Sequence, residues 1–88
     1  MFRENTEDHR FEWEEAGAIT FADYYHRGEV RVIRHVEAPM ALRGTGSAGR
    51  LMQAMADHAR AEGIRLAPVC GYAVAWFRRH RDAADVLG

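Results

Sequence analysis

The chain has 88 residues, which allows one compact domain over residues 1–88 with a thin core. Its hydrophobic fraction of 48% excludes an intrinsically disordered protein. Twelve arginines with no lysine against thirteen acidic residues give a formal net charge of −1, which disfavours a non-specific nucleic-acid binder. One cysteine excludes an intramolecular disulfide, no apolar run is long enough to span a membrane, and the charged start over residues 1–8 is unlike a signal peptide. We therefore expect a cytoplasmic protein without membrane contact.

Alternating apolar and charged residues predict strands in the first third of the chain. Phe11 and Trp13 alternate with charged neighbours, the period of a half-buried strand. Two stretches rich in β-branched and aromatic residues follow, each after a turn signal that contains glycine. The predicted strands are residues 10–14, 18–25 and 30–36, separated by turns at Ala16-Gly17 and at residues 26–29.

The third predicted strand contains a slip in its alternation, because Val32 and Ile33 are adjacent apolar residues. A β-bulge produces such a change of phase, and bulges are common next to functional sites. A strand buried on both faces at this point would give the same pattern. The sequence leaves both interpretations open.

A helix is predicted after Pro39, which ends the third strand. Gly63 is placed to cap its C-terminus, a strand over residues 64–69 follows, and a second helix is predicted from about Gly71 to Arg81. The second helix has Ala73, Trp76, Phe77 and His80 on one side. The first helix has one apolar face, formed by Ala48, Leu51, Met52, Met55, Ala56 and Ala59. The predicted order is β-β-β-α-β-α.

A glycine-rich turn joins the third strand to the first helix. Gly44 and Gly46 permit positive φ angles and leave the backbone N–H groups accessible, and the helix that follows adds the positive end of its dipole. The turn lacks the Lys-Ser/Thr ending of a Walker loop. It is either a phosphate-binding loop or a turn that needs small residues at a packed helix start. Its members are Arg43, Gly44, Thr45, Gly46, Ser47 and Ala48.

Two further groups could carry chemistry. Cys70 lies at the predicted start of the second helix, where the helix dipole favours a thiolate, although a lone cysteine is also a common small core residue. His35 and Glu37 end the third strand, where either could act as a general base or be a solvated strand-end side chain. The remaining histidines lack the spacing of metal ligands, so no metal site is expected.

Taken together, these motifs resemble the GNAT superfamily of N-acetyltransferases, and more specifically its very short single-domain members. Arg43-x-x-Gly46-x-Ala48 matches the Arg/Gln-x-x-Gly-x-Gly/Ala signature for the cofactor at all three positions. The resemblance covers residues 5–87. Beside this loop, it rests on Arg10-Phe11-Glu12, His35-Val36-Glu37-Ala38-Pro39, Pro68-Val69-Cys70 and Arg78-Arg79-His80-Arg81-Asp82.

The resemblance implies a minimal GNAT fold, an α/β (α+β) architecture with a mostly antiparallel sheet and two helices. It also implies binding of acetyl-CoA, with the loop amides of residues 43–48 on the diphosphate. The pantetheine arm would pair with the backbone of Val36, Glu37 and Ala38, in a slot opened by a strand bulge and by splaying of the next strand. Cys70 would lie near the thioester, and Arg78 and Arg79 near the adenosine phosphates.

For the reaction, the resemblance implies transfer of an acetyl group to a small amine or an exposed peptide amine. By position, Glu37 is a candidate base and Tyr72 a candidate acid, whereas in a second route Cys70 is acetylated first. Trp76, Gly71 and Arg81 depart from the subfamily pattern. The alternatives are a CoA-binding module without turnover and, more weakly, a nucleic-acid binder that uses the arginines of the last helix. We expect a monomer or a small homo-oligomer, and an acceptor that could be macromolecular.

Overall fold

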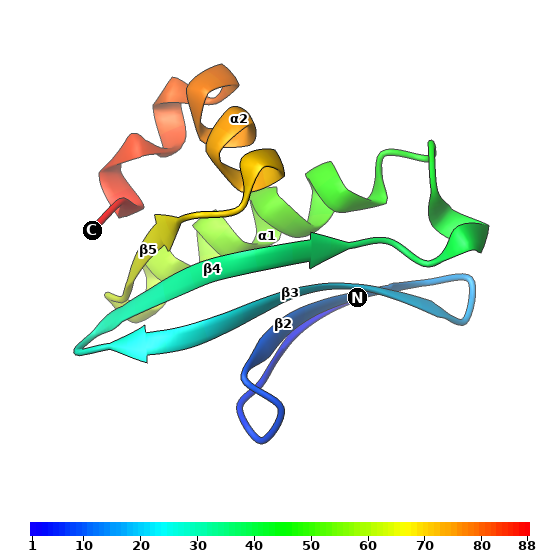
Figure 1. The fold of residues 1–88 in the computed structure, drawn as a ribbon, viewed down its shortest axis with the longest axis horizontal. Coiled ribbons are helices and arrows are strands. Elements are labelled where there is room, and N and C mark those ends of the chain that lie inside the picture. The colour runs from blue at the N-terminus through cyan, green and yellow to red at the C-terminus, as the bar shows by residue number, and fades with distance from the viewer.

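The computed structural model describes residues 1–88, which form one mixed sheet with its helices packed against it (Figure 1). The strands lie in the order β1-β2-β3-β4-β5; the first four are antiparallel, and α1 crosses over to make β5 parallel to β4. No helix has the length and apolar character needed to cross a membrane. The elements are β1 (Phe2–Asn5), β2 (Arg10–Glu15), β3 (Ala18–Arg27), β4 (Val30–Glu37), the 3-10 helix η1 (Met40–Leu42), α1 (Ser47–Glu62), β5 (Arg65–Pro68), α2 (Gly71–Arg79) and the 3-10 helix η2 (Arg81–Val86).

The predicted mixed α+β class, mostly antiparallel sheet and two α-helices are confirmed, but the predicted order lacks a strand. Four strands precede α1, because residues 2–5 form β1 instead of a charged tail. This segment is short and polar, and its pairing depends on distant partners: Arg3 Nε donates to Glu12 at 2.6 Å, and Glu4 accepts from Arg31 at 3.0 Å. The charged side chains of Arg3 and Glu4 are thus paired with residues of other strands.

One hydrophobic core joins α1, α2 and η2 to the sheet. The predicted stripe of α1 is buried from Leu51 to Ala59, whereas Ala48 at its start is only partly covered. Gly63 ends α1 in the left-handed conformation, with φ 70°, as predicted. The core residues include Phe11, Ala22, Tyr24, Ile33, Leu51, Met52, Met55, Ala56, Ala59, Leu66, Ala73, Trp76 and Phe77.

The C-terminal segment turns back onto the sheet after α2. We expected α2 to reach Arg81, but it ends at Arg79, because His80 leaves the helical conformation with φ −123° and ψ 69°. The His80 ring stacks on Trp76 with 4.0 Å between ring centroids. The next residues form η2, which buries Val86 and brings Leu87 into a bridge with Leu66 of β5. Figure 1 shows this segment returning beside β5.

Both interpretations of the slip in β4 describe part of what is found. Asp23 pairs with His35 while the next residue of β3, Tyr24, pairs with Ile33, so β4 carries one extra residue, Arg34. Such an extra residue is a β-bulge. The two residues that carry the slip, Val32 and Ile33, are both fully buried, although they point to opposite faces of the strand. The bulge therefore follows immediately after a segment that is buried on both faces.

Candidate functional site

The glycine turn is a compact loop between η1 and α1. Gly44 and Gly46 have φ angles of 77° and 87°, the left-handed region that glycine adopts without strain. Thr45 closes the loop, since its N–H and its hydroxyl both donate to Leu42 O, at 3.2 and 2.6 Å. Ser47 anchors it to the sheet through a buried 2.9 Å hydrogen bond between its Oγ and Thr20 Oγ1. These hydrogen bonds tie the loop to Leu42 and to β3.

The start of α1 presents a run of unused hydrogen-bond donors. The first hydrogen bond of the helix is from Arg50 N to Gly46 O at 3.1 Å. Gly46, the residue before the helix, has no side chain that could accept from the N–H groups of the first turn. The N–H groups of residues 46–49, and that of Gly44, donate to no acceptor in the chain. No acidic residue lies in the first turn to balance the positive helix end. These groups can bind an anion such as a phosphate.

Beside this loop, the second half of β4 has an edge without a partner strand. β5 pairs with β4 only as far as Ile33, which lies opposite Pro68. Val69 N and Cys70 N both donate to Ile33 O, at 2.9 and 3.2 Å, and the chain then turns into α2. Residues 34–37 consequently have β3 on one side and no strand on the other. An extended ligand can add along such an edge through backbone hydrogen bonds.

The three residues predicted to pair with the pantetheine arm do not have the same surroundings. Val36 and Glu37 lie on the free part of β4, where Val36 packs against the core and Glu37 is half exposed. Ala38 lies beyond the strand, and its carbonyl accepts a 3.2 Å hydrogen bond from Arg43 Nε. Val36 and Glu37 thus retain a free strand edge, while the carbonyl of Ala38 is already in use.

Cys70 and Tyr72 lie at the start of α2, close to the end of the β4–β5 pairing. The Cys70 sulfur caps the helix by accepting from Ala73 N at 3.4 Å. The Tyr72 hydroxyl approaches the first turn of α1, 3.8 Å from the position that a Cβ on residue 49 would occupy. Burial raises the pKa of Tyr72, and the neighbouring Cys70 adds to this, while Arg79 opposes it. A phenol is protonated at neutral pH without this shift, and the raised pKa makes Tyr72 a weaker proton donor than a free tyrosine.

The other predicted residues are divided between different surfaces. His35 and Glu37 form a pair, with 2.9 Å between His35 Nε2 and Glu37 Oε1, and both are about half exposed. Arg79 is near enough to Tyr72 to affect its pKa, whereas Arg78 lines an open groove between α2 and the C-terminal segment. The two arginines thus have different neighbours, and contact of either with the adenosine phosphates stays a prediction.

Sequence analysis missed two residues that adjoin the loop. Arg50 forms a two-pronged ion pair with Glu15, with Nε–Oε1 at 2.6 Å and Nη2–Oε2 at 3.0 Å. Its third nitrogen, Nη1, faces Gly46. Arg50 follows Gly46 by four residues, about one helical turn, which is a signal that could have placed it near the loop. Nothing in the sequence indicates that it pairs with Glu15, 35 positions earlier.

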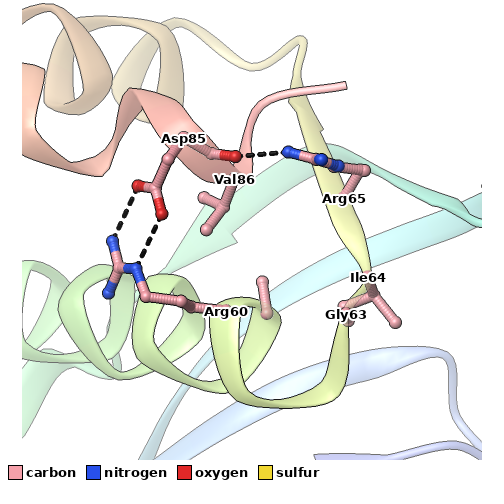
Figure 2. A pocket seen from close by; sticks show the side chains of 7 residues that line it. Arg60, Gly63, Ile64, Arg65, Asp85 and Val86 are labelled. Carbon is pink, nitrogen blue, oxygen red and sulfur yellow. Dashed lines mark hydrogen bonds and ion pairs between the residues drawn. The ribbon is translucent and has the colours of Figure 1, made fainter.

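A second hollow lies at the other end of α1 and is lined by the α1–β5 turn and η2 (Figure 2). Arg60 and Asp85 form a two-pronged ion pair across it, at 2.7 and 2.8 Å, and Arg65 donates to the backbone carbonyl of Asp85. Its polar groups are thus paired with one another. It lies more than three helical turns from the free amides of residues 46–49.

Comparison with known proteins identifies a family and a similar fold. The sequence profile of the GCN5-related N-acetyl-transferase family matches residues 10–86. The NMR solution structure of a GCN5-like protein from Staphylococcus aureus superposes with a TM-score of 0.68 at 18% sequence identity, covering 100% of this chain and 87% of that chain, a similarity of fold. Comparison with curated proteins gives no match. From the profile match, the chain belongs to the GCN5-related N-acetyltransferase family, a family of acetyltransferases.

Proposed function

We propose that the chain binds acetyl-CoA between the residue 43–49 loop and the free edge of β4, and that it acetylates an amine. The observation that carries this proposal is the run of unused N–H groups from Gly46 to Gly49. It belongs to the loop that follows the unpaired segment 34–37, and Arg43 of this loop donates to Ala38 O at the end of that segment, at 3.2 Å. A diphosphate suits the amides and the helix end, and a pantetheine arm, which contains amide groups, suits a strand edge. Acetyl-CoA would supply the acetyl group as an activated thioester.

The side chains available for proton transfer are Glu37 and Tyr72. Glu37, assisted by His35 at 2.9 Å, is the proposed base that takes the proton lost by the amine. Tyr72 is the proposed acid, because its hydroxyl lies beside the first turn of α1. A free backbone N–H on the edge of β4 would stabilise the developing oxyanion.

Cys70 is proposed as a neighbour of the reacting group and not as its carrier. Its sulfur accepts a hydrogen bond from Ala73 N, a structural use that caps α2. Direct attack by the amine needs no acetylated cysteine. Loss of the sulfur should therefore weaken the start of α2 while leaving acetyl transfer in place.

The test is an incubation of the full chain with labelled acetyl-CoA and a panel of amines. The panel contains small polyamines and peptides with free α- or ε-amino groups, and mass spectrometry follows both the amide product and the released CoA. Formation of an amide in equal amount to free CoA supports the proposal. Binding of CoA without transfer to any amine identifies a binding module instead, and absence of CoA binding refutes the proposal altogether.

The same assay on Cys70→Ala separates the two routes. Retained transfer with no acetyl adduct on the wild-type protein supports direct attack. An acetyl adduct on Cys70 that disappears when amine is added, together with loss of transfer in Cys70→Ala, would establish the route through the cysteine.

A further inference from the structure

The position of Arg50 is unfavourable for the helix that contains it. It is the fourth residue of α1, at the end of the first turn, where the helix dipole is positive and a cation is destabilising. The first turn has no acidic residue to compensate, and the only carboxylate paired with Arg50 is that of Glu15, at the end of β2. The helix itself therefore does not favour a positive charge at this point, and the contact that holds it is the ion pair with Glu15.

Glu15 holds the guanidinium of Arg50 by one of its edges. Nε and Nη2 contact the two carboxylate oxygens at 2.6 and 3.0 Å, and Glu15 is itself held by a hydrogen bond from Trp13 Nε1. Nη1 donates to no acceptor in the chain. It lies 3.1 Å from the position that a Cβ on Gly46 would occupy. The free edge of the guanidinium thus faces the loop that carries the unused amides.

We infer that Arg50 is a diphosphate-binding residue whose orientation is set by Glu15. This inference rests on the proposed function and adds a residue outside the Arg-x-x-Gly-x-Ala signature. A guanidinium held by a carboxylate on one edge can donate from another edge to a phosphate oxygen, and it loses little side-chain entropy in doing so. Gly46 then has a second role, because a side chain there would displace Nη1.

Arg60 provides a matched control. It lies on the same helix and forms the same two-pronged pair, with Asp85 at 2.7 and 2.8 Å (Figure 2). It lies about 15 Å further along α1, from ten residues at about 1.5 Å each, in the last turn, where a cation is favourable. Arg60→Ala therefore removes an equivalent ion pair at a distance from the loop.

The experiment is a calorimetric titration with CoA and with 3′-dephospho-CoA, which retains the diphosphate. We expect Arg50→Ala to weaken the binding of both ligands by about 10- to 150-fold, the effect of losing one charge-assisted hydrogen bond. Arg60→Ala should leave both affinities unchanged. Glu15→Gln breaks the same ion pair but keeps the guanidinium, so it should lose less affinity than Arg50→Ala.

Three results would overturn the inference. Equal losses of affinity in Arg50→Ala, Glu15→Gln and Arg60→Ala would mean that these ion pairs affect binding only through the fold. If Arg50→Ala lost affinity for CoA but not for 3′-dephospho-CoA, Arg50 would contact the 3′-phosphate and not the diphosphate. Unchanged affinity in Arg50→Ala would show that Arg50 does not contact the ligand. If the wild-type protein binds neither ligand, the proposed function itself fails, an outcome distinct from these three.

Discussion

Gly46→Ala is the substitution whose effect can be worked out most fully, because one methyl group perturbs both the fold and the site. Gly46 has φ 87°, and a residue with a Cβ in the left-handed region costs about 1–2 kcal/mol in folding free energy. The same methyl group would lie 3.1 Å from Arg50 Nη1, so the guanidinium would have to shift by a few tenths of an ångström. Complete loss of one hydrogen bond to a charged ligand costs about 1.5–3 kcal/mol, so this shift should weaken CoA binding measurably, by at most about 10- to 150-fold.

Gly28→Ala separates the two effects. Gly28 has φ 63° in the turn between β3 and β4, and a Cβ there would meet nothing within 4 Å. The two variants should therefore lose similar stability in urea unfolding, and only Gly46→Ala should lose affinity for CoA in calorimetry. Wild-type affinity in Gly46→Ala, or an equal loss in Gly28→Ala, would refute this account of the loop.

The remaining predictions concern stability. Burial and the Glu4 carboxylate raise the pKa of Tyr24 to about 12, so the protein should lose stability from pH 10 to 12 as the unfolded chain ionises first. Tyr24→Phe should flatten that decline in urea titrations, and an unchanged slope would contradict it. Burial alone would raise the pKa of Glu12, but hydrogen bonds from three neighbours lower it below 4.5. The stability that Glu12 contributes should thus be present above pH 4.5 and fall below it. Glu12→Gln should show a shallower acid transition by circular dichroism, whereas an identical transition would count against this. Leu51 of α1 is fully buried, so Leu51→Ala should lower the free energy of unfolding by about 2–5 kcal/mol. A loss below about 1 kcal/mol would show a loosely packed core.

The parts of the fold that could be predicted from the sequence are those set by local patterns. The face of α1 repeats with the helical period, and Gly46 and Gly63 lie where α1 begins and ends. The glycine loop was recognised because its residues are contiguous and precede a helix. The adjacent apolar pair in β4 marked the bulge to within a residue or two.

The parts that could not be predicted depend on contacts between distant residues. β1 is held by pairing of Arg3 and Glu4 with partners on other strands, and nothing within residues 2–5 distinguishes it from a charged tail. Arg50 could be placed near the loop, but its orientation depends on Glu15, 35 residues away. The end of α2 depends on the packing of His80 against Trp76 and on the return of Val86 to the core.

The central claim is that residues 43–49 bind CoA. The most direct test is a titration of the isotopically labelled protein with CoA, monitored by N–H correlation NMR. If the unused donors bind the diphosphate, the largest shifts will fall on the amides of residues 46–49, with smaller shifts along residues 34–37. The amide signals of the hollow around Arg60 and Asp85 should not shift, since this hollow lies at the other end of α1 and its charged side chains are already paired. Saturable shifts confined to that hollow, or no saturable shifts on the loop, would contradict the assignment of residues 43–49 as the CoA site.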